Sequence, residues 1–370
     1  MSKEQLTLLH KNHLALGAKM APFAGFMMPL QYSTIKQEVE AVRNNAGIFD
    51  VGHMGEFEVV GPDAYAFVDY LITNNFLTAG DLKAVYSPLC REDGTIIDDL
   101  IAYKVDFDHV LLCVNAANIE KDWEWITSQQ KGFNCVLKNS SNNYSLIALQ
   151  GPNSEQLLNK LNLMPTGEFE HYSVRKLLWN GEEIIVARTG YTGEEGVELF
   201  AQGQAICQIW DKLIKLNVTP CGLIARDVLR LEAGFSLYGN ELTDELTPLD
   251  CGLKWTVRGE KGRFIGKESL CDSQYTPRYR QIRLALERGV PRTSYPVVNS
   301  SEAEVGVVTS GTLSPTLGRG IALASIPREK FSISESYAIK IRDKIYPATR
   351  YKKPFITGGY KPWNSKPQKS

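Results

Sequence analysis

The chain has 370 residues, a formal net charge of −1 at pH 7, 43% hydrophobic residues and 22% charged residues. This length predicts two or three domains, the charge excludes a strongly basic nucleic-acid-binding protein, and no apolar run is long enough for a membrane span, so we expect neither nucleic acid nor membrane as a partner. The cysteines are scattered and form no CxxC pair, which predicts reduced thiols, and the dispersed histidines predict no metal site. The first residues, Met1-Ser-Lys-Glu-Gln, lack the features of a signal peptide, so we expect a cytoplasmic protein.

The first part of the chain alternates predicted strands and helices. Thr34 and Gln37 have the spacing of a capping box, which predicts the start of an amphipathic helix that runs toward Gly47. Hydrophobic periodicity then predicts strands at 55–60 and 110–114 and helices at 64–72 and 119–126.

Two adjacent carboxylates lie within a strand predicted to follow a turn at Asp93-Gly94. Because side chains alternate between the faces of a strand, Asp99 shares its face with Ile97, Ile101, Tyr103 and Val105, whereas Asp98 lies on a more mixed face. A carboxylate in an apolar row must be paired, hydrogen-bonded or protonated. Asp99 is therefore the candidate functional acid, and a structural role explains it equally well at this point.

The strand, Gly-Pro and helix pattern of residues 55–72 is repeated at 144–161. A hairpin follows at 177–186, where Asn180-Gly181 is a strong turn signal, and then a helix at 205–216. The repeat predicts two α+β units of similar plan, with a ligand site at their junction.

Glycines at 190, 193 and 196 form neither a Walker A motif nor a GxGxxG fingerprint. They are typical of a close backbone approach that directs Tyr191 and Glu198 into a shared space, although an ordinary loop explains them as well. In the helix predicted at 221–234, Arg226 and Arg230 share a face and can pair with acids or hold a ligand carboxylate. Short strands at 305–309, 321–326 and 337–341 predict a small barrel or jelly roll.

Colinear sequence blocks extend these motifs along the chain: residues 16–29, Phe49-Asp-Val-Gly-His-Met54, Ile97-Asp-Asp-Leu100, Gln150-Gly-Pro152, and residues 188–196, 221–234 and 309–318. Together they resemble the T-protein (aminomethyltransferase) family of the glycine cleavage system over essentially the whole length. The resemblance implies an α+β, three-domain cloverleaf with two folate-binding α+β units at 1–140 and 141–280, which can interleave, and a C-terminal β-barrel or jelly roll at 281–370.

The resemblance also implies an enzyme, an aminomethyltransferase that uses tetrahydrofolate as co-substrate and no metal. Its partner is the lipoylated H-protein, whose lipoyl arm donates an aminomethyl carbon to folate N5. The products are 5,10-methylenetetrahydrofolate, ammonia and dihydrolipoyl H-protein.

Site residues follow from the same resemblance. Asp99 matches the essential carboxylate, Glu198 the acid that recognises the pterin edge, and Arg226 a folate-contacting arginine. Asp98 is left as the structural acid. Further matches to folate-pocket positions are Tyr86, Asn115, Tyr172, Tyr191 and the C-terminal Tyr360.

The chain departs from the family pattern at Gly52, where the motif has Ser, at Ile224, where it has a small residue, and at 356–359, where some members carry an Arg. Two alternatives stay open, a folate-dependent demethylase and a non-enzymatic folate-binding protein of iron–sulfur cluster maintenance. The latter's cysteine is missing from Thr189–Glu195. Whether Asp99 takes a proton or only holds a charge is also open.

Overall fold

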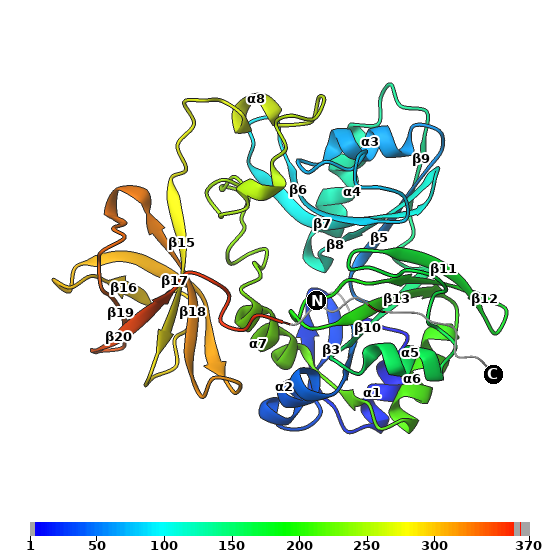
Figure 1. Ribbon diagram of the computed structural model, residues 1–370, viewed down its shortest axis with the longest axis horizontal. Coiled ribbons are helices and arrows are strands. Elements are labelled where there is room, and N and C mark those ends of the chain that lie inside the picture. The colour runs from blue at the N-terminus through cyan, green and yellow to red at the C-terminus, as the bar shows by residue number, and fades with distance from the viewer. Residues whose placement is uncertain (1–3, 359–362, 364–370) are drawn as a thin grey trace.

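The computed structural model describes residues 4–358 and residue 363. Its chain forms three lobes, two of mixed α and β structure and one barrel (Figure 1). The helices are α1 (His10–Ala15), α2 (Ile35–Asn44), α3 (Ala64–Leu71), α4 (Ile119–Ser128), α5 (Ser154–Lys160), α6 (Ala205–Lys215), α7 (Leu223–Ala233) and α8 (Lys267–Leu270). Short 3-10 turns cover Ala116–Asn118, Lys254–Thr256 and Arg328–Lys330.

The first lobe is built on a five-stranded sheet in the order β6-β7-β8-β5-β9. One face packs against α3 and α4 in a core that includes Phe57, Phe67 and Leu112. The other face turns toward the second lobe, and Tyr103 meets Phe200 there with ring centroids 5.1 Å apart. The strands are β5 (Gly55–Val60), β6 (Ala84–Cys90), β7 (Ile96–Asp106), β8 (His109–Val114) and β9 (Val136–Asn139).

The second lobe contains a six-stranded sheet in the order β11-β12-β13-β10-β4-β14, covered by α5 and α6. Its β4 comes from far earlier in the chain than its neighbour β10, so the strands of the first lobe, β5 to β9, are inserted between two strands of the second. The strands are β4 (Gly47–Asp50), β10 (Tyr144–Gln150), β11 (Val174–Trp179), β12 (Glu182–Ala187), β13 (Gly196–Gln202) and β14 (Thr219–Pro220). A small sheet precedes them, with β1 (Gln5–Leu6), β2 (Lys19–Phe23) and β3 (Phe26–Gln31).

The third lobe is a closed barrel in the order β15-β18-β17-β16-β19-β20. Its strands are β15 (Tyr279–Leu286), β16 (Pro296–Val298), β17 (Glu304–Ser314), β18 (Arg319–Pro327), β19 (Tyr337–Ile341) and β20 (Lys344–Tyr351). Helix α7 lies between this barrel and the second lobe (Figure 1), and Arg230 on α7 donates a hydrogen bond to Ser310 of β17.

The predicted α+β class with a C-terminal barrel is confirmed. The capping box is present, because Thr34 accepts from the backbone N–H of Gln37 while the Gln37 side chain accepts from Thr34. Asn180 and Gly181 both have positive φ, as a tight hairpin turn requires. Pattern alone missed β2, β3 and β15, and it treated residues around β16 as loop. Among the described residues, no helix is both long and apolar enough to cross a bilayer.

Candidate active site

Asp99 lies in the middle of β7, on the face that turns toward the second lobe. Its Oδ2 accepts a hydrogen bond from the Tyr86 hydroxyl at 3.0 Å, and its Oδ1 accepts one from Asn115 Nδ2 at 2.9 Å. Tyr86 comes from the adjacent strand β6, and Asn115 follows directly after β8. Three neighbouring strands therefore bring these three predicted site residues together.

The two adjacent acids differ in burial in a way that alternation did not predict. Asp98 is 0% exposed, whereas Asp99 is partly exposed. Asp98 accepts hydrogen bonds from the Asn115 backbone N–H, Asn115 Nδ2 and Asn118 Nδ2. Asp99 keeps its apolar neighbours Tyr103 and Val105, but Asp98 is the more buried of the two acids. Lys104, at the end of the face that was expected to be more mixed, is itself 1% exposed, whereas Asp99 keeps partial contact with solvent.

The pKa of Asp99 is raised to about 7 by burial and by the neighbouring Asp98 charge. Hydrogen bonds from Tyr86 and Asn115 act in the opposite direction, because they stabilise the carboxylate. A carboxyl group with this pKa can hold a negative charge or exchange a proton near neutral pH.

Aromatic side chains surround Asp99. Burial and the Asp99 charge raise the pKa of Tyr86, and the phenols of Tyr191 and Tyr172 raise it further, which indicates that the three tyrosines are close neighbours. Tyr86 also stacks on Trp255, with ring centroids 5.9 Å apart. Trp255 is 54% exposed, and no sequence motif indicated it.

Glu198 on β13 is buried at the interface between the two lobes, with 6% exposure. Its Oε2 accepts hydrogen bonds from the Tyr103 hydroxyl at 2.9 Å and from Thr189 Oγ1 at 2.5 Å. Among the described residues none donates to Oε1. Tyr103 shares a face of β7 with Asp99, and the Tyr103 side chain connects the sheet of the first lobe to Glu198 in the sheet of the second.

Arg226 on α7 places its guanidinium 4.8 Å from the centre of the Tyr191 ring. Within residues 4–358 and 363, its guanidinium makes no hydrogen bond or ion pair, so the guanidinium donors are available to a ligand. Burial, followed by the Arg226 charge, lowers the pKa of His53 to about 4, so His53 is neutral and adds no second positive charge.

The 188–196 loop is a close backbone approach, as one of the two sequence interpretations had it. A Cβ on Gly190 would lie 2.0 Å from Gln150 Oε1, and one on Gly196 would lie 2.5 Å from the Leu149 carbonyl. The loop holds Tyr191, which donates to the Ser236 carbonyl and stacks on Phe235 with centroids 5.9 Å apart.

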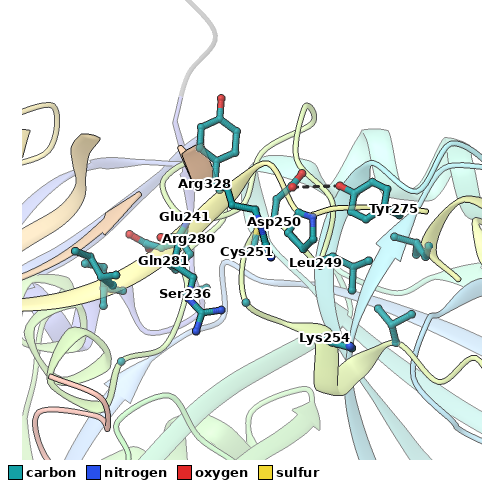
Figure 2. Close-up of a pocket in the computed structure, with 18 of the residues that line it drawn as sticks. Ser236, Glu241, Leu249, Asp250, Cys251, Lys254, Tyr275, Arg280, Gln281 and Arg328 are labelled. Carbon is teal, nitrogen blue, oxygen red and sulfur yellow. Dashed lines mark hydrogen bonds between the residues drawn. The ribbon is translucent and has the colours of Figure 1, made fainter. Parts of the chain in front are cut away.

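A cavity of about 650 Å³ lies between the barrel strand β15 and the segment 234–277. In Figure 2, Glu241, Arg280 and Gln281 are grouped on one side, and Asp250, Tyr275 and Lys254 on the other. None of the predicted site residues that the structure describes lines it. It borders their surroundings through Ser236, the partner of Tyr191, and through Cys251, whose pKa is raised by burial and by nearby charges that include Asp99.

Three further positions that the sequence analysis named are Tyr360, Tyr172 and Gly52. Tyr360 lies outside the described residues. Tyr172 has a positive φ of 61° and is held through its backbone N–H, which donates to Arg188 O. At Gly52 a Cβ would meet Asp50 Oδ1 at 3.2 Å, a spacing that leaves little room for a larger residue.

The assembled groups offer an ionisable carboxyl among aromatic rings, a second buried carboxylate with one oxygen available, and an unpaired guanidinium. Such a set suits a flat, polar-edged ligand and can stabilise positive charge that develops beside Asp99. Among the described residues, no group of His, Cys, Asp and Glu has the arrangement of a metal site.

Comparisons with known proteins extend over all three lobes. A family model described as the GCVT N-terminal domain matches residues 9–261, and one described as the glycine cleavage T-protein C-terminal barrel domain matches residues 279–356. An aminomethyltransferase of Thermosipho melanesiensis is 43% identical over 358 residues, 96% of this chain and 98% of that protein. One from Thermotoga maritima is 44% identical over 357 residues, 95% and 98% of the two chains. The crystal structure of glycine cleavage system aminomethyltransferase T from Bartonella henselae superimposes with a TM-score of 0.90 at 30% identity, covering 97% of this chain and 99% of that one.

Proposed function

The chain belongs to the glycine cleavage T-protein family and is an aminomethyltransferase, and from this premise we propose that it transfers the aminomethyl carbon of a lipoyl arm to tetrahydrofolate. The donor is the lipoylated H-protein. The products are 5,10-methylenetetrahydrofolate, ammonia and dihydrolipoyl H-protein.

The observation that carries this proposal is the pairing of the partly exposed Asp99 with Tyr86 and Asn115, at a pKa of about 7. The carbon that moves becomes cationic as its bond to sulfur or nitrogen weakens. A fixed carboxylate in a partly dry site stabilises that charge without first reorganising water. Asp99 therefore acts as the electrostatic partner of the reacting carbon.

The fit to a folate rests on Glu198 and Arg226. The amino-pyrimidine edge of a pterin presents N–H donors, and Glu198 Oε1 has no donor among the described residues, while Oε2 is already held by Tyr103 and Thr189. A carboxylate fixed on one oxygen can orient a planar edge with the other. Arg226, unpaired and next to Tyr191, supplies donors for ring oxygen or carboxylate.

The cavity beside β15 supports the same substrate. The half-buried Arg283 and Gln281 lie on the outward face of this strand, and Arg283 Nε and both Gln281 amide atoms have no hydrogen-bond partner within the described residues. Burial lowers the pKa of Arg283, because no anion compensates its charge. We therefore assign this cavity to the acidic glutamyl end of the folate.

The test mixes the protein with aminomethyl-loaded H-protein and tetrahydrofolate and measures ammonia and methylenetetrahydrofolate together. Both should appear with the wild type. Asp99→Asn should retain folate binding and lose turnover by about two orders of magnitude or more. Comparable turnover in that variant would remove Asp99 from its role. Donation by a small methylated compound would indicate a demethylase, and folate binding without any transfer would indicate a non-enzymatic protein.

A further inference from the structure

Asp122 is a buried acid that the proposed reaction does not use. It lies in the first turn of α4, is 0% exposed, and has no hydrogen-bond donor for either carboxylate oxygen among the described residues. A bare buried carboxylate of this kind is costly. The charged group that acts on it most strongly is Asp98 on β7, against which α4 packs.

The two acids of this pair have unequal surroundings. Asp98 accepts three hydrogen bonds from amide groups of the protein: the Asn115 backbone N–H at 3.1 Å, Asn115 Nδ2 at 2.8 Å and Asn118 Nδ2 at 2.8 Å. Asp122 accepts none from the described residues. A single proton shared by the pair is therefore bound on Asp122, where the negative charge would be unsupported.

Other charged groups do not change this assignment. Lys121, next to Asp122 on α4, is engaged by the Tyr238 hydroxyl and by Asp244 at a partly exposed position. The N-terminal end of α4 favours one negative charge on the pair. Two adjacent buried carboxylates without a cation would repel each other. If both acids were protonated, the amide donors around Asp98 would have no negative charge to stabilise.

We propose that Asp122 is a positioning residue: its protonated carboxyl donates a hydrogen bond to Asp98, which stays anionic and fixes the Asn115 amide that orients Asp99. The Asn115 Nδ2 group lies 2.8 Å from Asp98 Oδ1 and 2.9 Å from Asp99 Oδ1, so it donates one hydrogen to each of the two acids. The chain of contacts runs from Asp122 through Asp98 and Asn115 to the reacting acid. Burial and the Asp98 charge raise the pKa of Asp122 well above its usual range, which agrees with a retained proton.

The first test measures the proton itself and does not depend on the proposed function. Infrared spectra of protein labelled with ¹³C-aspartate are recorded at a pH where Asp99 is ionised. The wild type should show the carbonyl stretch of a protonated aspartic acid, and Asp122→Asn should lose it. The aspartate label excludes Glu56, another buried acid whose pKa burial raises. Absence of the band from the wild type, or its persistence in Asp122→Asn, would overturn the assignment.

The second test rests on the proposed function and separates positioning from folding. Asp122→Asn keeps a neutral donor to Asp98 and should retain kcat within about twofold, whereas Asp122→Leu removes the donor and should lower kcat about tenfold or more with an unchanged KM for tetrahydrofolate. Glu120→Gln, an exposed acid in the same helical turn, is the matched control. Equal kcat in Asp122→Leu and the wild type would contradict the proposal.

If Asp122→Leu does not fold, the infrared band and Asp122→Asn decide the question. If the folded Asp122→Asn variant lost as much kcat as is expected for Asp122→Leu, a hydrogen bond donated to Asp98 would not be enough to explain the role of Asp122, which would contradict the proposal. If the protein shows the infrared band but transfers no aminomethyl group, the proposed function is contradicted, whereas the protonation of Asp122 is still supported.

Discussion

The Asn115 amide bridges two neighbouring carboxylates, with Nδ2 at 2.8 Å from Asp98 Oδ1 and 2.9 Å from Asp99 Oδ1. Asp98 is fully buried, whereas Asp99 is partly exposed. The bridge makes the orientation of Asp99 depend on Asp98, because the amide cannot rotate without losing both contacts.

Removing the bridge should reduce turnover without unfolding the protein. Asn115→Ala deletes one of the two side-chain donors to Asp99, and misplacement of a reacting group is costly, so we expect kcat to fall by about 10- to 100-fold while the folate KM stays within about twofold. Steady-state assays with H-protein measure both. Asn159→Ala, an exposed asparagine on α5, is the control. A larger effect on KM than on kcat would contradict the orienting role.

The reaction should depend on pH through Asp99. Its pKa of about 7 lies above that of an ordinary aspartate, so the group is protonated below that pH and ionised above it. If the carboxylate is the active form, kcat rises with pH up to about 7 and then levels, falling about tenfold per unit on the acid side.

The charge on Asp98 contributes to that raised pKa. Asp98→Asn should therefore move the acid limb of the kcat profile to lower pH, whereas Asp81→Asn, at an exposed position in the same lobe, should leave it in place. An unchanged or upward-shifted limb in Asp98→Asn would show that Asp99 does not set the profile.

Glu198 should govern folate affinity. Replacing it with Gln removes a charged acceptor for the ligand, which is worth about 1.5–3 kcal/mol, so the Kd for tetrahydrofolate should rise by about 10- to 100-fold. Tyr103→Phe removes one of the two hydrogen bonds that hold Glu198 and should have a smaller effect in the same direction. Calorimetric titration measures both, with the exposed Glu183→Gln as control. Unchanged affinity in Glu198→Gln would remove it from the pterin site.

Arg230 should contribute to stability more than to chemistry. It is 1% exposed, pairs with Glu241 at 2.9 Å and bonds Ser310 of the barrel. Arg230→Met leaves Glu241 buried without its partner, a loss of about 3–5 kcal/mol. The urea midpoint of unfolding should fall accordingly, and the double variant Arg230→Met/Glu241→Gln should recover part of it. Arg328→Met, whose side chain makes no ion pair among the described residues, is the control. A midpoint equal to that of wild type would contradict the claim.

Local sequence determined much of the framework. Alternation along residues 96–105, the capping box at Thr34 and the Asn180-Gly181 turn each depend on neighbours a few residues apart, and the structure contains the corresponding elements. The colinear blocks then indicated the family, and through it Asp99, Glu198 and Arg226. β2 and β3 were missed because they carry prolines and little regular alternation.

Only the tertiary structure decided which acid is buried and what each one contacts. Tyr103 reaches Glu198 across 95 positions of sequence, and β4 joins a sheet whose other strands begin about a hundred residues later. Helix α4, which carries Asp122, packs on β7, which carries Asp98. Periodicity assigns a side chain to a face, but burial depends on what packs against that face. For this reason the sequence identified Asp99 and, through the family resemblance, Asn115 as candidates, whereas the fold placed the Asn115 amide between Asp98 and Asp99.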